Sequence, residues 1–467
     1  MEQQQQKERK RLRLVLFPLP AQGHINPMLE LATILHSKGF SITIIHINFN
    51  SPNPSNHPHF TFHSIPHGLP DHMLKPTTGS GTKDVISIIT HLNITTVEPF
   101  RECLTSNALD DDEPVACLIS DAMFHFTRAV ADSLKLPRLV LRTTSATSFN
   151  VFPAFPLLLQ KGYLPVQDSR LEEPVVEFPP LKVKDLPVIE TQYPEKFYEL
   201  ISRVVSETKA SSGIIWNTFE ELEQSALDSI ANQLSIPMFP IGPFHKYNLA
   251  YSSSSFLVED QSSISWLNTQ PPNSVIYVSF GSVAVLSETE FLEIAWGLAN
   301  SNLPFLWVVR PRSIHGSEWL ELLPNGFLES LRGRGHIVKW APQQQVLAHL
   351  AVGAFWTHSG WNSTMESICE GVPMICKPSF IDQNVNSRYV SHVWKVGVKL
   401  ENGILERGDI ERMITKLMRE KEGEEIRCRV SKLKDMAISC LKHGGTSYKY
   451  LDSLVNHIHS LAHLNPL

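Results

Sequence analysis

The stretch "GAFWTHSGWNSTMESICE", residues 353–370, combines two kinds of secondary structure. Its first six residues form a short apolar run of the kind found in buried strands, and "SG" follows as a turn. From Trp361 onward, apolar side chains recur at the roughly 3.6-residue spacing of a helix, which leaves Met365 and Ile368 available to a core. The stretch therefore predicts a strand, a tight turn and a helix, the unit from which parallel α/β sheets are built.

The same alternation of strand and helix patterns extends along the chain. Runs that are apolar on both faces are typical of parallel strands covered by helices, and they fall into two groups. A Ser-, Pro- and Gly-rich segment at 240–263 separates the groups, so the 467 residues are expected to form an α/β protein with two domains, 1–245 and 246–467. The expected strands are 13–19, 40–47, 116–121, 138–144, 274–280, 304–310, 335–340, 353–358, 373–378 and 396–400.

The composition removes several classes of function. Because 41 Lys and Arg residues stand against 47 Asp and Glu residues, giving a net charge of −6, no basic excess is available for nucleic acid or an anionic membrane. No run reaches the roughly 18 apolar residues of a membrane span, and "LVLFPLPA" (14–21) is interpreted as a first strand rather than a signal peptide. Six scattered cysteines fit a reducing compartment, so we expect a cytoplasmic location. We also expect a monomer. No His, Cys and carboxylate cluster has metal-ligand spacing, and we expect no metal.

Polar side chains gather where the helix of the opening stretch begins. That helix starts at the carboxyl end of a strand, where ligands bind in open parallel sheets, and its first turn offers unpaired backbone N–H groups to an anion. His358, Asn362 and Ser363 add side-chain donors suited to a pyrophosphate. Glu366 lies one turn beyond Asn362, where a carboxylate can accept two hydrogen bonds from a ribose diol. The pattern Ser363-x-x-Glu366 is also typical of a capping box, which needs no ligand.

Two further strand ends carry residues suited to a nucleotide. Gly281 and Ser282 follow strand 274–280, where a glycine lets the backbone approach an anion and a hydroxyl can donate to it. Trp340 ends strand 335–340, where its flat indole can stack on a base or pack within a turn. Together with the helix start, these residues predict a nucleotide site in the second domain.

The segment 340–383, "WAPQQQVLAHLAVGAFWTHSGWNSTMESICEGVPMICKPSFIDQ", resembles the 44-residue signature box of plant UDP-dependent glycosyltransferases. The resemblance covers nearly the whole chain, including "LPAQGHINPMLELATIL" (19–35), "IIWNTFEELE" (214–223) and "GGTSYKYL" (444–451), and is closer still to the branch with steviol and cytokinin glucosyltransferases. It implies a GT-B type fold of two facing Rossmann-like domains, the first binding the acceptor and the second the sugar nucleotide. The last helix, about 446–460, is expected to pack back on the first domain.

By this resemblance the donor substrate is UDP-glucose, without a cofactor or a metal. Gln383 resembles the glucose users, whereas a histidine there would favour galactose, and Trp361 stands where some glucuronic acid users carry arginine. The resemblance places residues on the uracil, the ribose, the phosphates and the transferred sugar in turn. The donor-binding set that it implies is Trp340 and Ala341; Gln343 and Glu366; Ser282, His358, Trp361, Asn362 and Ser363; Asp382 and Gln383; with Thr143 and Thr144 either reaching the donor from the first domain or closing a turn.

Transfer of glucose to a hydroxyl group needs a base for the departing proton. His24 follows the first strand, and we expect a loop there with a helix beginning at Pro27. Asp121 ends another strand of the first domain. By resemblance, His24 is the catalytic base, and Asp121 orients its imidazole and stabilises the charged ring as in a Ser-His-Asp triad. Direct displacement would invert the α linkage of the donor and give a β-glucoside.

The acceptor is expected to be a lipophilic small molecule, such as a terpenoid, a phenolic or a hormone, bound by loops 67–81 and 150–165. Two other functions compete with this one. A catalytically silent UDP-sugar-binding protein would lack the base, and a glycoside hydrolase would need paired carboxylates at the bond to be cleaved. Six apolar residues could line the acceptor pocket or belong to the core: Phe124, Phe126, Phe149, Phe152, Phe155 and Leu157.

Overall fold

The computed structural model describes residues 11–74, 82–106, 113–191, 193–247, 255–400 and 405–464. Its strands form two sheets in which neighbouring strands run parallel, so the predicted α/β class with two parallel sheets is confirmed. The first sheet contains β1 (Arg13–Phe17), β2 (Ser41–Ile47), β3 (Thr61–Ile65), β4 (Val115–Asp121), β5 (Arg138–Arg142), β6 (Gly213–Trp216) and β7 (Met238–Pro240); the second contains β8 (Val275–Ser279), β9 (Phe305–Val308), β10 (Gly335–Val338), β11 (Val352–Thr357), β12 (Met374–Cys376) and β13 (Gly397–Lys399).

The two sheets share one topology. The first has the order β3-β2-β1-β4-β5-β6-β7, and the second has the order β10-β9-β8-β11-β12-β13. In each, the chain lays three strands outward in one direction and then returns to the other side of the first strand. The strand order therefore reverses between β1 and β4, and again between β8 and β11. Crevices at such reversals, beyond the carboxyl ends of the strands, are where ligands bind in open α/β sheets.

All ten expected strands are present, and β3, β6 and β7 are additional. β3 exposes part of its surface at the sheet edge, β6 has four residues beginning with a glycine, and β7 has three residues ending in a proline. Runs this short or this polar carry too little pattern to distinguish a strand from a loop.

Helices bury both faces of the first sheet. Alternate residues of β1 point to opposite cores, with Val15 and Phe17 in one cluster and Leu14 and Leu16 in the other, which explains why this strand is continuously apolar. The helices are α1 (Gln22–Ser37), α2 (Asp71–Leu74), α3 (Thr82–Thr95), α4 (Val97–Thr105), α5 (Thr127–Ser133), α6 (Ala146–Val151), α7 (Phe155–Gln160), α8 (Pro194–Lys209), α9 (Glu220–Gln233), α10 (Ser262–Leu267), α11 (Glu288–Asn300), α12 (Phe327–Ser330), α13 (Gln343–Leu347), α14 (Trp361–Glu370), α15 (Asp382–Arg388), α16 (Arg407–Arg419), α17 (Lys421–Leu441) and α18 (Thr446–Leu464).

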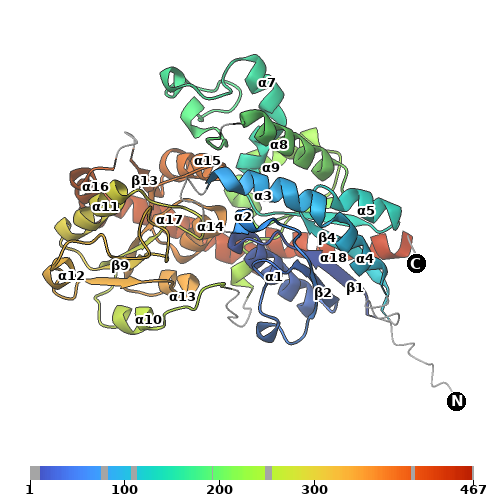
Figure 1. Ribbon diagram of the computed structural model, residues 1–467, viewed down its shortest axis with the longest axis horizontal. Helices are drawn as coiled ribbons and strands as arrows, with labels where there is room; N and C mark the ends of the chain where they lie inside the picture. Colours follow the sequence, from blue (N-terminus) through green and yellow to red (C-terminus); the bar gives the residue numbers. More distant parts are fainter. Residues whose placement is uncertain are drawn as a thin grey trace.

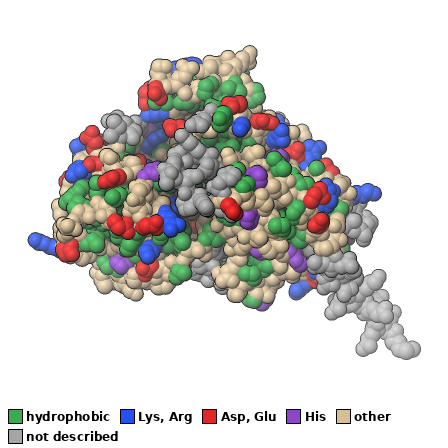
Figure 2. Space-filling model, viewed as in Figure 1, with side chains coloured by type: hydrophobic (Ala, Val, Ile, Leu, Met, Phe, Trp, Pro, Cys, Tyr) green, Lys and Arg blue, Asp and Glu red, His purple; other side chains and the backbone are tan. Residues whose placement is uncertain are grey.

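The molecule consists of two halves, the first built around the sheet β1–β7 and the second around the sheet β8–β13. They lie side by side, and the α7 region projects from the first half (Figure 1). The C-terminal helix α18 crosses to the first half, where Leu451, Leu454 and Ile458 pack in the core beneath β1 and β4. Acidic and basic side chains are interspersed over the visible face of both halves (Figure 2). The boundary expected at residues 245 and 246 stays a prediction, and residues 248–254 of the expected linker lie outside the described residues.

Candidate active site

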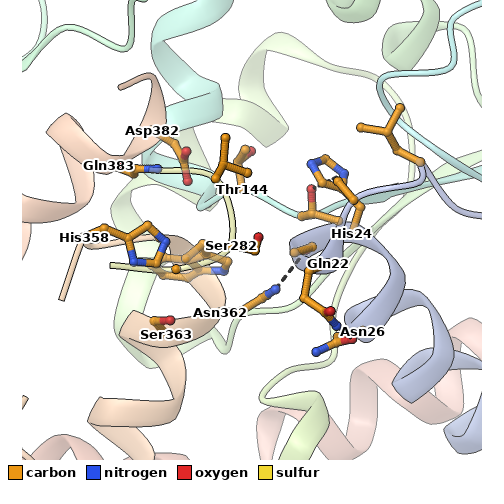
Figure 3. A pocket seen from close by; sticks show the side chains of 18 of the residues that line it. Gln22, His24, Asn26, Thr144, Ser282, His358, Asn362, Ser363, Asp382 and Gln383 are labelled. Atoms are coloured by element: carbon orange, nitrogen blue, oxygen red, sulfur yellow. Dashed lines mark hydrogen bonds between the residues drawn. The ribbon is translucent and has the colours of Figure 1, made fainter. Parts of the chain in front are cut away.

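A cavity of about 360 Å³ lies between the halves, where the carboxyl ends of the two sheets face each other. The first half contributes α1 and the loop after β5, and the second contributes the loops after β8 and β11 together with α13, α14 and α15. Figure 3 shows His24, Gln22 and Asn26 opposite His358, Asp382 and Gln383 across this space. The expected residues that line it are His24, Thr143, Thr144, Ser282, Trp340, Ala341, Gln343, His358, Trp361, Asn362, Ser363, Glu366, Asp382 and Gln383.

His24 and Asp121 form a hydrogen-bonded pair at the strand reversal of the first sheet. His24 Nδ1 lies 2.7 Å from Asp121 Oδ2, and Thr143 Oγ1 lies 3.1 Å from the same nitrogen. Asp121 is buried and its other oxygen accepts a hydrogen bond from Met123 N, so its position is defined. Burial opposes a charge on the imidazole, but the Asp121 carboxylate outweighs it and raises the pKa of His24. With Nδ1–H donated to Asp121, Nε2 is left as the proton acceptor.

The prediction that His24 lies in a loop before a helix beginning at Pro27 is wrong. Helix α1 begins at Gln22 and contains both His24 and Pro27. Proline has no N–H, so the carbonyl of Gly23 loses its usual partner within the helix. Asn362 Nδ2 of the other half donates to that carbonyl at 2.9 Å (Figure 3). The hydrogen bond that permits the helix to continue through Pro27 thus comes from a residue of the nucleotide site, and His24 lies in the first helical turn.

The His358 imidazole occupies a space that only glycines permit. Gly281 has a φ of +74°, and a Cβ atom there would lie 2.6 Å from His358 Nε2; a side chain at Gly360 would collide with the same ring. Arg310 Nε donates to the Gly281 carbonyl at 2.7 Å and holds the loop that carries Ser282. Burial and the Arg310 charge lower the pKa of His358 to about 4, so it is a neutral donor near neutral pH.

The capping-box interpretation of Ser363 and Glu366 is wrong. The N-cap of α14 is Gly360, which has no side chain to accept a hydrogen bond, and Ser363 lies within the helix. Gln343 Nε2 instead donates to Ser363 Oγ at 2.9 Å and to Glu366 Oε2 at 2.6 Å. The Glu366 carboxylate is therefore held at the cavity wall by α13, where its oxygens can still accept further hydrogen bonds.

Asp382 and Gln383 are the first two residues of α15, and both line the part of the cavity formed by the second half. Ile381 before them has a φ of +54°, a strained conformation for a β-branched residue, and such strain is concentrated at functional positions. Asn386 Nδ2 donates to Asp382 Oδ2 at 3.1 Å, and burial raises the pKa of Asp382 to about 6. The Gln383 carbonyl oxygen accepts from Ser379 N at 2.9 Å, so its amide NH₂ is the group that can face a sugar hydroxyl.

The two tryptophans of the expected set have different surroundings. Trp340 is only partly buried beside Ala341 at the cavity wall, which is consistent with a stacking surface. Trp361 is 3% exposed, and its indole N–H donates to the carbonyl of Asn217 in the first half at 2.8 Å. The Trp361 side chain therefore joins the two halves at the cavity wall, and its expected role in donor binding stays a prediction.

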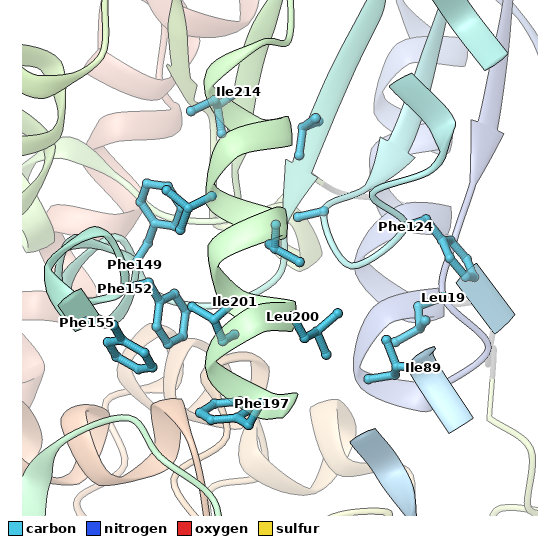
Figure 4. Close-up of a cluster of buried hydrophobic side chains, with 14 of the residues drawn as sticks. Leu19, Ile89, Phe124, Phe149, Phe152, Phe155, Phe197, Leu200, Ile201 and Ile214 are labelled. Carbon is cyan, nitrogen blue, oxygen red and sulfur yellow. The ribbon is translucent and has the colours of Figure 1, made fainter. Parts of the chain in front are cut away.

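The residues expected around the acceptor are mostly core. Phe124, Phe126, Phe149 and Phe155 pack in the large cluster of the first half, and Leu157 is 39% exposed, so only Phe152 of the six lines the cavity. Figure 4 shows Phe152 against Phe197 and Ile201 of α8, which line the cavity with it. Helix α3 supplies the remaining apolar wall through Val85, Ile86 and Ile89. Residues 75–81 of the expected loop 67–81 lie outside the described residues.

Among the cavity residues that the sequence analysis missed, three are charged or join the two halves. Arg142 ends β5 and is 2% exposed; its guanidinium lies 4.5 Å from the centre of the Phe149 ring, and burial lowers its pKa to about 10. Glu30 on α1 and Gln344 on α13 hydrogen bond to each other across the two halves. Arg142 was concealed inside a strand pattern, and the other two meet only through the fold, so a lone sequence carries no signal for them.

Two kinds of feature are absent from the residues that the structure describes. None of the helices there is long and apolar enough to cross a membrane. Within the same ranges, His, Cys, Asp and Glu side chains do not gather in a group of three or more that could hold a metal ion.

Comparison with known proteins relates the chain to one family of enzymes. The family model described as "UDP-glucoronosyl and UDP-glucosyl transferase" matches residues 103–443. UDP-glycosyltransferase 76B1 of Arabidopsis thaliana is 51% identical, covering 95% of this chain and 97% of the relative, and UDP-glycosyltransferase 76G1 of Stevia rebaudiana is 50% identical, covering 97% and 98%. Among solved structures, that of Phytolacca americana UGT2 complexed with UDP-2fluoro-glucose and pterostilbene has a TM-score of 0.79 and 28% identity, covering 96% of this chain and 99% of that one.

Proposed function

The chain belongs to the plant family 1 UDP-glycosyltransferases, enzymes with the GT-B fold, and from this premise we propose that it transfers glucose from UDP-glucose to a hydroxyl group of a lipophilic small molecule. One observation carries the proposal: His24, held by the buried Asp121 carboxylate behind it, lines the same cavity as the side chains suited to a nucleotide. A base and a leaving group on opposite walls of one cavity are what direct transfer requires.

The donor would lie along the second half. In this arrangement the uracil stacks on Trp340 beside Ala341, and the ribose diol meets Glu366 and Gln343. The pyrophosphate lies at the start of α14, where backbone N–H groups, Ser282, Ser363, Asn362 and the neutral His358 donate to it. The transferred sugar meets Asp382 and Gln383, and the glutamine supports glucose.

The reaction would proceed in one displacement. The acceptor hydroxyl gives its proton to His24 Nε2 as its oxygen forms the bond to the anomeric carbon, and UDP departs with the electron pair of the broken bond. Asp121 stabilises the imidazolium that results, and Thr143 helps to hold the ring. Attack from the face opposite UDP converts the α linkage of the donor into a β-glucoside.

The acceptor would occupy the apolar part of the cavity beneath α3 and α8. The walls formed by Phe152, Phe197, Ile201 and Ile89 favour an aromatic or terpenoid body whose hydroxyl reaches His24. Pterostilbene, the compound in the complex of the Phytolacca americana protein, is of this general size and character. A cytoplasmic location and a monomeric state remain predictions from the sequence.

The test is to incubate the protein with UDP-glucose and a panel of terpenoid, flavonoid, phenolic and hormone acceptors, and to measure UDP release and product mass. We expect release that depends on an acceptor, and a glucoside whose anomeric proton shows the coupling of a β linkage. EDTA should leave the rate unchanged, because the proposed phosphate site uses no metal. Tight UDP binding without release on any acceptor would instead favour a catalytically silent binding protein, and an α-glucoside would refute direct displacement.

A further inference from the structure

Two carboxylates from opposite halves share one amide group at the ribose end of the cavity. Gln344 Nε2 lies 3.1 Å from Glu30 Oε1 on α1 and 3.1 Å from Glu366 Oε1 on α14. An amide nitrogen carries two hydrogens, so Gln344 donates one to each carboxylate. Gln343, its neighbour on α13, holds the second oxygen of Glu366. The helix that carries His24 is thereby joined to the carboxylate proposed for the ribose.

Glu30 belongs to a polar stripe on an otherwise apolar helix. Gln22, Asn26 and Glu30 follow one another at four-residue spacing and all line the cavity, while the opposite face of α1 packs in the core. A carboxylate in that position faces the ribose side rather than the acceptor side, because its partner is the amide next to Glu366. Because Glu30 acts on Glu366 through Gln344, it is a positioning residue and not a catalytic one.

The surroundings of the hydrogen bonds between Glu30, Gln344 and Glu366 disfavour negative charge on both carboxyl groups at once. Burial and the nearby Glu366 raise the pKa of Glu30 to about 8, whereas the hydrogen bond from Gln344 opposes the rise. Burial also raises the pKa of Glu366, to which Glu370 contributes. A diphosphate brings further negative charge to the same cavity. The arrangement is therefore compatible with the donor when Glu30 carries a proton.

The other titratable groups at this cavity come from several elements. His57 has a pKa lowered by burial and is neutral, and burial raises the pKa of Tyr277 on β8. Glu259 lines the cavity from the segment before α10, and His24 lies two turns away on α1. All four are common to the wild type and to a Glu30 variant, so a comparison of the two isolates Glu30.

We propose that Glu30 is a positioning residue for the sugar nucleotide: through Gln344 it holds Glu366 for the ribose and joins the two halves. The inference rests on the proposed function, because it assigns the ribose to Glu366. It explains why an acidic side chain is placed beside another carboxylate at a site that must accept a diphosphate. It also predicts that donor affinity depends on pH in the alkaline range.

The test is to measure the Kd of UDP by calorimetry at pH 7.0 and 9.5 for the wild type, Glu30→Gln and Gln344→Leu, with Gln345→Ala on the same helix as the control. Glutamine at position 30 retains an oxygen for Gln344 but cannot ionise. If UDP binding raises the pKa of Glu30 by about one unit, the wild-type Kd rises about tenfold at pH 9.5, and Glu30→Gln changes less than about twofold. Gln344→Leu should bind UDP more weakly at both pH values, and Gln345→Ala should follow the wild type.

Equal pH dependence in the wild type and Glu30→Gln would overturn the proposal. With UDP-glucose as substrate, the expected change in Glu30→Gln at pH 9.5 is a lower KM at constant kcat; a change in kcat alone would contradict a positioning role. Thermal unfolding of each variant at both pH values identifies losses that come from the fold. The measurement of UDP affinity separates the Glu30 proposal from the proposed function. If the wild-type protein does not bind UDP at all, the proposed function itself is refuted.

Discussion

The contact between Gly281 and His358 allows a substitution with a matched control. Gly281→Ala places a Cβ atom 2.6 Å from His358 Nε2 at a φ of +74°, whereas Gly316 has a φ of +73° with no atom within 4 Å of the added Cβ. A left-handed conformation costs an L-residue about 1–2 kcal/mol, so Gly316→Ala should lose about that much stability. The overlap in Gly281→Ala should add about 1–3 kcal/mol, unless the loop moves away from His358.

Either response of Gly281→Ala disturbs the phosphate site, because the same loop carries Ser282. Loss of one hydrogen bond to a charged group costs about 1.5–3 kcal/mol, which corresponds to an increase of about 10- to 150-fold in the Kd of UDP. Chemical denaturation gives the stabilities, and calorimetry gives the Kd. We expect Gly316→Ala to keep the wild-type Kd. If Gly281→Ala matched Gly316→Ala in both measurements, the inferred packing of His358 against this loop would be wrong.

Three further perturbations test separate parts of the site. Turnover should fall with pH below the pKa of His24, because the base must be neutral. Asp121 makes the largest contribution that raises this pKa, so in Asp121→Asn the acid limb of kcat/KM should move to lower pH while the maximal rate drops, and an unshifted limb would contradict the pairing. Asn362→Asp cannot donate to the Gly23 carbonyl and adds a negative charge, so the Kd of UDP should rise at least about tenfold and the free energy of unfolding should fall by about 1–3 kcal/mol; retained UDP affinity would argue against this phosphate site. Trp361→Phe removes the hydrogen bond to Asn217, so the free energy of unfolding should fall by about 1–3 kcal/mol while UDP affinity changes little. Unchanged stability with a weaker UDP affinity would show that Trp361 acts in donor binding instead.

The elements with strong local patterns could be predicted from sequence. Helix α14 has the bounds that the apolar spacing of 361–370 indicates, and Ser282, His358 and Glu366 all line the cavity because each follows a parallel strand at the reversal of its sheet. The position of these residues could be predicted because it depends on the order of strand, turn and helix along the chain, which the apolar pattern indicates.

Other features depend on contacts between residues far apart in the chain. Helix α1 begins before Pro27 because Asn362, 339 residues away, replaces the hydrogen bond that proline removes. The bridge between Glu30 and Gln344 spans 314 residues, and no local pattern reports it. The phenylalanines near 149 were ambiguous for a different reason, because core and pocket walls have the same composition and differ only in what packs against them.

The central claim is that His24 serves the chemistry and not the binding of the donor. The most direct test is to compare His24→Ala with the wild type in UDP affinity and in turnover on a productive acceptor. We expect a Kd for UDP within about threefold of the wild type and a kcat about 100- to 10,000-fold lower, the usual contribution of a positioned base. Wild-type turnover in His24→Ala would show that His24 is not the base.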